Sequence, residues 1–191
     1  MVARSHPVHY EFGEYIAHDA ASNTKHEYLD GQIYAMAGGT PEHAALISSV
    51  HGHLWTQIGG TRCRPHMADL RIRVRETGLA TYPDIPIVCG HTERDPEDAN
   101  TVTNPTVIVE VLSESTEKYD RGEKFDHYKR IPSLRAYVLV AHNQRAIEVW
   151  TRVTDDAWDR AAYVAGGEAK IDAIAATLDV DKVYEDASER D

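Results

Sequence analysis

An apolar run from Val107 to Leu112 is interrupted by a single acidic residue, Glu110. A run without polar alternation predicts a central strand that is covered on both faces, as in a sheet flanked by helices. Burying an unpaired carboxylate costs several kcal/mol, so Glu110 needs a cation, hydrogen-bond donors or a metal beside it. The alternatives are a position at the exposed end of the strand or a simple pair with an arginine.

The first half of the chain predicts two helices and a hairpin. Residues 11–19 are compatible with a short helix, and two strand-like runs flank Asp30-Gly31, a dipeptide typical of tight hairpin turns. Residues 41–58 predict a longer helix with Thr40 as its N-cap and Pro41 in its first turn, ended by Gly59-Gly60. Its expected apolar face comprises Ala44, Ile47, Val50 or His51, Leu54 and Ile58.

The second half predicts most of the sheet. Strands are expected at 62–67 and 69–75, the latter with alternating arginines on a solvated or anion-facing side, and a short strand begins at Asp84. The segment ERDPEDAN is expected to be a solvent loop. A helix over 117–130, ended before Pro132, precedes an antiparallel meander formed by LRAYVLVA, RAIEVWTRV and WDRAAYVA. This order predicts a mixed α+β or α/β fold with a central sheet, in one domain (1–191) whose residues 1–20 form a loosely attached arm.

Composition limits the class of protein. The 191 residues are 42% hydrophobic and 27% charged, without an apolar stretch of membrane length or the apolar core of a signal peptide, so we expect a cytoplasmic protein without a membrane partner. Cys63 and Cys89 lack CxxC spacing and suit a reducing compartment as small core residues. The 31 acidic against 20 basic residues give a net charge of −11, which repels nucleic acid unless basic residues gather locally or a divalent metal offsets the charge.

Candidate chemistry gathers around Glu110. Asp84 should lie on a neighbouring strand, and two carboxylates with a backbone carbonyl such as that of Val111 form a typical partial shell for Mg²⁺, one of whose waters can act as a nucleophile. Asp120, Lys124 and Tyr128 are spaced i, i+4, i+8 and share one helix face. Lys124 is suited to orient the water or stabilise a developing negative charge, although Asp120 and Lys124 alone also suit an ordinary salt bridge.

The segments HEYLDGQIYAMAGGTPEHAALISSV, YPDIPIV and VIVEVLSESTEKYDRGEKFDHYKRIPSLRAYVLV together resemble the bacterial restriction endonucleases of the Uma-two type, a branch of the PD-(D/E)XK nuclease superfamily. The resemblance extends from about Tyr28 to Tyr184. It implies a restriction-endonuclease-like core with Asp84 and Glu110 as metal ligands. Leu112 stands where the superfamily motif has lysine, and Lys124 on the helix is the match. Two further positions differ from the residues that are usual in the family: Glu114 stands in place of proline, and Ala136 in place of an acid. Neither is one of the implied metal ligands.

Glu27 and His43 match recurrent family positions. Each suits a group that supports the metal ligands or carries protons, and each equally suits a hydrogen-bonded structural residue. Asp69 and Arg71 either border the cleft or occupy solvated strand positions. His51 and His53 lie two apart, on different helix faces, which argues against a zinc site.

The sequence therefore predicts a DNA endonuclease that uses Mg²⁺, with Mn²⁺ as a substitute, and that works as a homodimer because two strands call for two sites. The alternative is a catalytically silent interaction protein with a nuclease fold. A third possibility, a glycosidase carboxylate pair, lacks an aromatic-lined sugar cleft. The position of Lys124 relative to the carboxylates discriminates between the first two.

Overall fold

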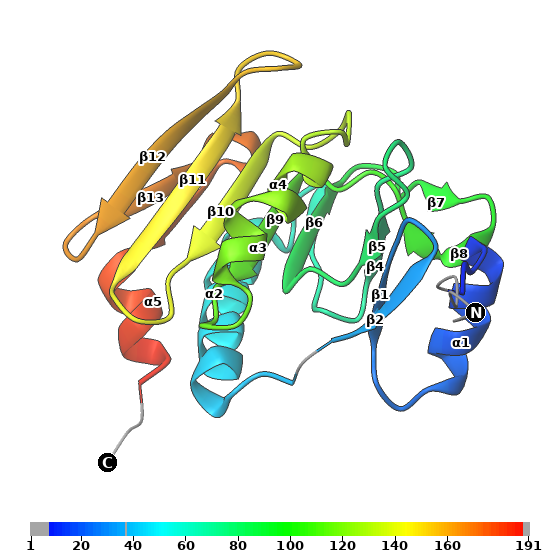
Figure 1. Cartoon of the computed structure of the whole chain (residues 1–191). Coiled ribbons are helices and arrows are strands. Elements are labelled where there is room, and N and C mark those ends of the chain that lie inside the picture. The colour runs from blue at the N-terminus through cyan, green and yellow to red at the C-terminus, as the bar shows by residue number, and fades with distance from the viewer. Residues whose placement is uncertain (1–7, 37, 189–191) are drawn as a thin grey trace.

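The computed structural model describes residues 8–36 and 38–188. Its central sheet has, within these residues, six strands in the spatial order β12-β11-β10-β9-β6-β3. Figure 1 shows the part of this order from β12 to β6. Their bounds are β3 Cys63–Pro65, β6 Ile85–Cys89, β9 Val107–Val111, β10 Ala136–Val140, β11 Ala146–Arg152 and β12 Trp158–Val164. All five residues of β9 are buried, which confirms the prediction of a covered central strand. The predicted meander is also confirmed, because β11 pairs antiparallel with both β10 and β12.

A second six-stranded sheet has the order β2-β1-β5-β4-β8-β7 in the described part of the chain. Its strands are β1 His26–Leu29, β2 Gln32–Ala35, β4 Arg71–Arg73, β5 Ala80–Thr81, β7 Arg94–Asp95 and β8 Asp98–Val102. The predicted hairpin joins β1 to β2, with φ of 47° at Asp30 and 77° at Gly31, as a tight turn with two positive φ angles requires.

The expectation of a solvent loop at ERDPEDAN is wrong, because this segment contributes β7 and β8. Two of its acids lie against the arginines of β4. Asp95 is buried and binds Arg73, with 3.0 Å between the charged atoms, and Asp98 binds Arg71 at 2.8 Å. A charged segment can therefore form strands here because its charges are paired across the sheet.

Helices cover the central sheet on both faces (Figure 1). On one face lie α2 Pro41–Ile58, α5 Val180–Asp186 and the strand pair β13 Glu168–Ile171 with β14 Ala176–Asp179, joined by a short 3-10 helix, Asp172–Ile174. On the other face lie α3 Glu117–Arg121, α4 Glu123–Tyr128 and part of the second sheet. Alternate residues of β9 serve two cores: Val107, Val109 and Val111 pack toward α2, and Ile108 packs toward α4. The predicted mixed α+β fold is confirmed.

Two helices differ in detail from the sequence prediction. Helix α2 has the expected bounds and Thr40 cap, but Leu46 is also buried, Ile47 is only partly buried against the core, and Ala44 is exposed. The single helix expected over 117–130 is two helices, α3 and α4, which break at Gly122 with φ −118° and ψ −104°. Glycine has a low helix propensity, so a break there costs little. No helix in residues 8–36 and 38–188 is long and apolar enough to cross a membrane.

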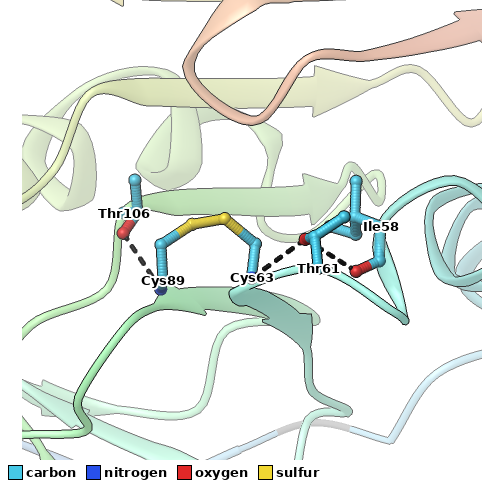
Figure 2. Close-up of a disulfide and its surroundings, with 5 residues drawn as sticks. All are labelled: Ile58, Thr61, Cys63, Cys89 and Thr106. Carbon is cyan, nitrogen blue, oxygen red and sulfur yellow. Dashed lines mark hydrogen bonds between the residues drawn. A yellow bond between two sulfur atoms is a disulfide. The ribbon is translucent and has the colours of Figure 1, made fainter.

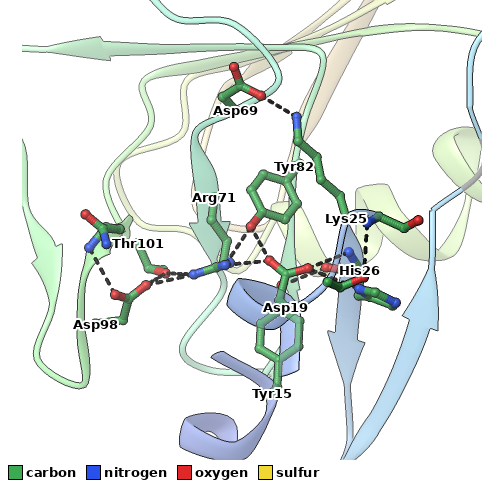
Figure 3. Close-up of polar contacts among 12 residues, drawn as sticks. Tyr15, Asp19, Lys25, His26, Asp69, Arg71, Tyr82, Asp98 and Thr101 are labelled. Carbon is green, nitrogen blue, oxygen red and sulfur yellow. Dashed lines mark hydrogen bonds and ion pairs between the residues drawn. The ribbon is translucent and has the colours of Figure 1, made fainter. Parts of the chain in front are cut away.

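Helix α1 (Phe12–Ala21) is fixed to the second sheet (Figure 3). Asp19 accepts hydrogen bonds from Nη2 of Arg71 at 2.7 Å and from the hydroxyl of Tyr82 at 2.5 Å, and Tyr15 is fully buried. The expectation of a loosely attached arm is therefore wrong for residues 12–20, which lie in α1, while residues 1–7 lie outside the described chain. Arg71 is buried rather than solvated, because its guanidinium is enclosed by Asp19 and Asp98.

The two cysteines form a disulfide, so the expectation of reduced core cysteines is wrong (Figure 2). The antiparallel pairing of β3 with β6 sets Cys63 directly opposite Cys89, with their Cα atoms 3.9 Å apart. Thr61 and Thr106 accept hydrogen bonds from the N–H groups of Cys63 and Cys89 respectively. The sequence separation of 26 residues gives no sign of this contact, which depends on the register of the two strands.

Candidate active site

Asp84 and Glu110 face each other across β6 and β9. These strands are antiparallel with Ile85 opposite Val109, so one further step of the register sets Asp84 opposite Glu110. The N–H of Asp84 donates to Oε2 of Glu110 at 3.1 Å, and the N–H of Val111 donates to Oδ2 of Asp84 at 2.8 Å. The two carboxylates therefore occupy one site at adjacent strand positions.

The ammonium group of Lys124 lies inside this carboxylate cluster. Its Nζ is 2.9 Å from Oε1 of Glu110 and 3.3 Å from Oδ1 of Asp120. The Tyr128 hydroxyl donates to the same Oε1 of Glu110 at 2.9 Å. The i, i+4, i+8 spacing thus brings Lys124 and Tyr128 onto Glu110, and Asp120 onto Lys124, although Gly122 separates α3 from α4. Glu110 tolerates burial because it has a cation and two donors beside it.

Glu27 and His43 lie at the more exposed side of the cluster. Oε1 of Glu27 is 3.7 Å from Nζ of Lys124 and also accepts from the Thr81 hydroxyl. Nε2 of His43 is 2.7 Å from the Val111 carbonyl oxygen and 3.7 Å from Oδ2 of Asp84. Since a carbonyl oxygen only accepts, Nε2 carries the proton in this contact. All the site residues predicted from sequence are therefore in one cluster, but their roles stay predictions.

The cluster is short of positive charge. Burial raises the pKa of Asp84, against the lowering effects of the Val111 N–H, His43 and Lys124. Burial likewise raises the pKa of Glu110 to about 8, with Lys124 opposing and Asp84 adding to the rise. Burial alone would lower the pKa of Lys124, but the surrounding carboxylates outweigh it and raise this pKa well above its ordinary value. One ammonium therefore serves several acids, and an added cation would stabilise them.

Two hydroxyl groups that sequence reasoning missed complete the cluster. The Tyr137 hydroxyl donates to the backbone carbonyl of Asp120 at 2.9 Å and so links β10 to α3. Thr81 donates to Glu27 from β5. A polar hydroxyl inside the apolar run AYVLV was the available signal for Tyr137, whereas nothing in the sequence marks Thr81.

The donor set fits a hard divalent cation only in part. Carboxylate and carbonyl oxygens are ligands that Mg²⁺ prefers, and Mg²⁺ commonly uses one or two carboxylates and keeps several waters. The described residues hold no group of three or more histidine, cysteine, aspartate or glutamate side chains arranged around a metal position. In addition, two of the expected ligand oxygens already have a partner. The Val111 carbonyl oxygen contacts Nε2 of His43, and Oε1 of Glu110 contacts Nζ of Lys124. The residues therefore suit Mg²⁺ with water and substrate ligands better than a closed protein cage.

Comparison with known proteins relates the chain to a family. The Uma2 family, described as "Putative restriction endonuclease", matches residues 11–180. Uncharacterized protein slr1290 of Synechocystis sp. is 34% identical over 171 residues, which cover 90% of this chain and 89% of that protein. Uncharacterized protein sll1609 of the same organism is 29% identical over 145 residues, 76% of this chain and 82% of that protein.

A solved structure shares the fold. It is described as a putative nuclease belonging to DUF820 from Anabaena variabilis, and it superposes with a TM-score of 0.72 at 15% sequence identity, covering 87% of this chain and 93% of the other. At this identity the likeness concerns the fold alone. The family match over residues 11–180 shows that this protein belongs to the Uma2 family of restriction-endonuclease-like proteins.

Proposed function

We propose that this chain is a metal-dependent endonuclease that hydrolyses DNA phosphodiester bonds. The observation that carries the proposal is the ammonium group of Lys124, which lies within hydrogen-bond distance of Glu110 in a cluster of buried acids. The buried acids around Lys124 outnumber it, so the cluster has negative charge beyond what its own ammonium group compensates, as a site for a metal ion requires. Membership of the Uma2 family and the fold shared with a nuclease also support the proposal.

Asp84, Glu110 and the Val111 carbonyl would hold Mg²⁺, or Mn²⁺ in its place. Bound there, the ion supplies Lewis acidity toward a phosphate oxygen and lowers the pKa of a water molecule. Lys124 donates toward the phosphate, where negative charge develops during in-line attack. Tyr128 and Asp120 orient Glu110 and Lys124, and His43 orients the Val111 carbonyl.

A catalytically silent interaction protein is the second candidate function. Two observations favour it: Glu110 already has Lys124 as its counter-ion, and the net charge of −11 repels DNA. In this case the buried cluster only holds β6, β9 and α4 together.

Plasmid nicking separates the two functions. Wild-type protein should nick supercoiled DNA with Mg²⁺ or Mn²⁺, and Lys124→Ala should lower the rate by about a hundred- to a thousandfold because it removes a charge-stabilising donor. Asp84→Ala should be at least as damaging, since it removes a metal ligand. Lys118→Ala, an exposed lysine of α3, is the matched control and should leave the rate unchanged. Thermal melts establish that each variant is folded.

The outcomes are distinct. Equal nicking by wild type and both site variants would mean that the activity comes from a contaminant or another site. No nicking by folded wild type with either metal would favour the interaction protein.

A further inference from the structure

A cavity of about 430 Å³ lies at the edge of the central sheet, away from the acidic cluster, and its walls are basic. Four of its lining side chains are Arg64, Arg94, His66 and His91, and none of its lining residues is an aspartate or glutamate. The whole chain carries 31 acidic and 20 basic residues. A basic cavity on such a chain is therefore a local reversal of the overall charge.

The two arginines of this cavity do not stabilise the fold through ion pairs. In the described part of the chain, no carboxylate forms an ion pair with Arg64 or Arg94. Arg94 is oriented by a hydrogen bond from its Nη1 to the Ala99 carbonyl at 2.5 Å, which leaves its charge uncompensated. Arg64 and His91 are exposed. The guanidinium groups are thus available to an external anion.

The local field is positive at His66. Burial lowers the pKa of this imidazole, and the charges of Arg64 and His51 lower it further. The cationic groups are therefore close enough to repel one another. A bound anion would relieve that repulsion.

Strand register relates the cavity to the acidic cluster. Arg64 on β3 is directly opposite Val88 on β6, so the two side chains share a sheet face. Val88 lies on the same face as Asp84, four residues earlier, because strand side chains alternate. At about 3.3 Å per residue, Val88 and Asp84 are therefore separated by roughly 13 Å along the strand.

We propose that the cavity between Arg64 and Arg94 binds the phosphate backbone of DNA a few nucleotides from the bond positioned at Asp84 and Glu110. This inference rests on the proposed nuclease function and adds the surface that holds the substrate. It also gives the acidic chain the local gathering of basic residues that DNA binding requires. Arg64 is the main contact, since it is exposed and its guanidinium has no ion-pair partner among residues 8–36 and 38–188.

The test is DNA binding without metal, which excludes cleavage. Fluorescence anisotropy with a labelled duplex should give a linear fall of log affinity with log salt concentration for the wild type. Arg64→Ala should lower the slope by about 0.9, the value of one phosphate contact. Arg64→Lys should keep most of the wild-type slope, because lysine retains the positive charge. The matched control is Arg145→Ala, which removes an exposed arginine that pairs with Asp181 and does not line the cavity.

Nicking in the presence of Mg²⁺ adds a second measurement. Arg64→Ala should raise the DNA concentration for half-maximal rate and leave the maximal rate unchanged. If Arg64→Ala and Arg145→Ala have equal slopes, the cavity does not bind DNA, even if wild type nicks plasmids. If wild type binds with a slope that Arg64→Ala lowers but never nicks, the cavity proposal stands and the nuclease proposal fails. No binding by wild type at low salt would overturn the cavity proposal.

Discussion

Glu110 lies in the strand because the cluster around it supplies a cation and donors. Lys124 and Tyr128 each lie 2.9 Å from the same carboxylate oxygen. Even so, burial and the neighbouring Asp84 raise the pKa of Glu110 to about 8. The residue is therefore held in an arrangement in which an additional positive charge would be stabilising, and that is the property expected of a metal ligand.

Glu110→Gln should abolish Mn²⁺ binding and keep the fold, because it retains the side-chain volume and removes the charge. Isothermal calorimetry measures the affinity, and a thermal melt checks the fold. Asp126→Asn is the control, since it removes an acid of α4 whose side chain is 72% exposed. Unchanged Mn²⁺ affinity in Glu110→Gln would exclude Glu110 as a ligand.

Helix α1 depends on one buried acid for its place on the second sheet. Asp19 receives hydrogen bonds from Tyr82, Arg71 and the backbone of His26 (Figure 3). Burial opposes ionisation of Asp19, but these donors outweigh it and lower its pKa. The ion pair between Arg71 and Asp19 is therefore part of the folded structure at neutral pH.

Asp19→Asn should lower the free energy of unfolding by about 3–5 kcal/mol, because it leaves the buried guanidinium of Arg71 with one carboxylate fewer. Urea denaturation at neutral pH measures this change. Asp69→Asn is the control: its side chain is 88% exposed beside Lys25, and such a pair contributes about 0–1 kcal/mol. Equal losses in the two variants would contradict the anchoring role of Asp19.

The same comparison predicts a pH dependence. The folded pKa of Asp19 is below the unfolded value of about 3.9, so its contribution is complete above that value and is lost as pH falls through the folded pKa. The difference in unfolding free energy between wild type and Asp19→Asn should therefore shrink below about pH 4. A difference that stays constant in acid would show that the Asp19 charge does not matter.

The net charge of −11 governs how the whole molecule meets DNA. We expect weak binding that falls steeply with salt and improves with Mg²⁺, since the cation offsets acids that otherwise repel phosphate. Anisotropy titrations with Mg²⁺ and with chelator measure the difference, using Lys124→Ala, which slows cleavage and keeps the proposed metal ligands. A double variant that also carries Glu110→Gln should gain less from Mg²⁺, because it lacks a metal ligand. Tight binding in chelator at ordinary salt would contradict this prediction.

Cleavage of both strands of a duplex calls for two sites, so we expect the active species to be a homodimer. Sedimentation in the presence of a duplex should give a mass of two chains, each of 21.4 kDa, per DNA molecule. Single-strand nicks without linear product would be expected of a monomer. A monomeric protein that linearises plasmid in one binding event would contradict the dimer.

Local sequence was sufficient for the elements whose conformation depends on neighbouring residues. Asp30-Gly31 specifies a turn through its positive φ angles, and Thr40 with Pro41 specifies where α2 begins. The apolar run at β9 identified a strand covered on both faces. The members of the acidic cluster were identified by combining helix spacing with family resemblance.

The three-dimensional fold decided which distant charges and sulfurs meet. Arg71 looked solvated but is enclosed by Asp19 and Asp98, and ERDPEDAN forms strands because its acids face the arginines of β4. Cys63 reaches Cys89 through the register of β3 and β6. The physical reason is that a side chain's own neighbours fix its backbone angles and face, whereas its partner across a sheet depends on strand order and register, which are set by the packing of the entire chain.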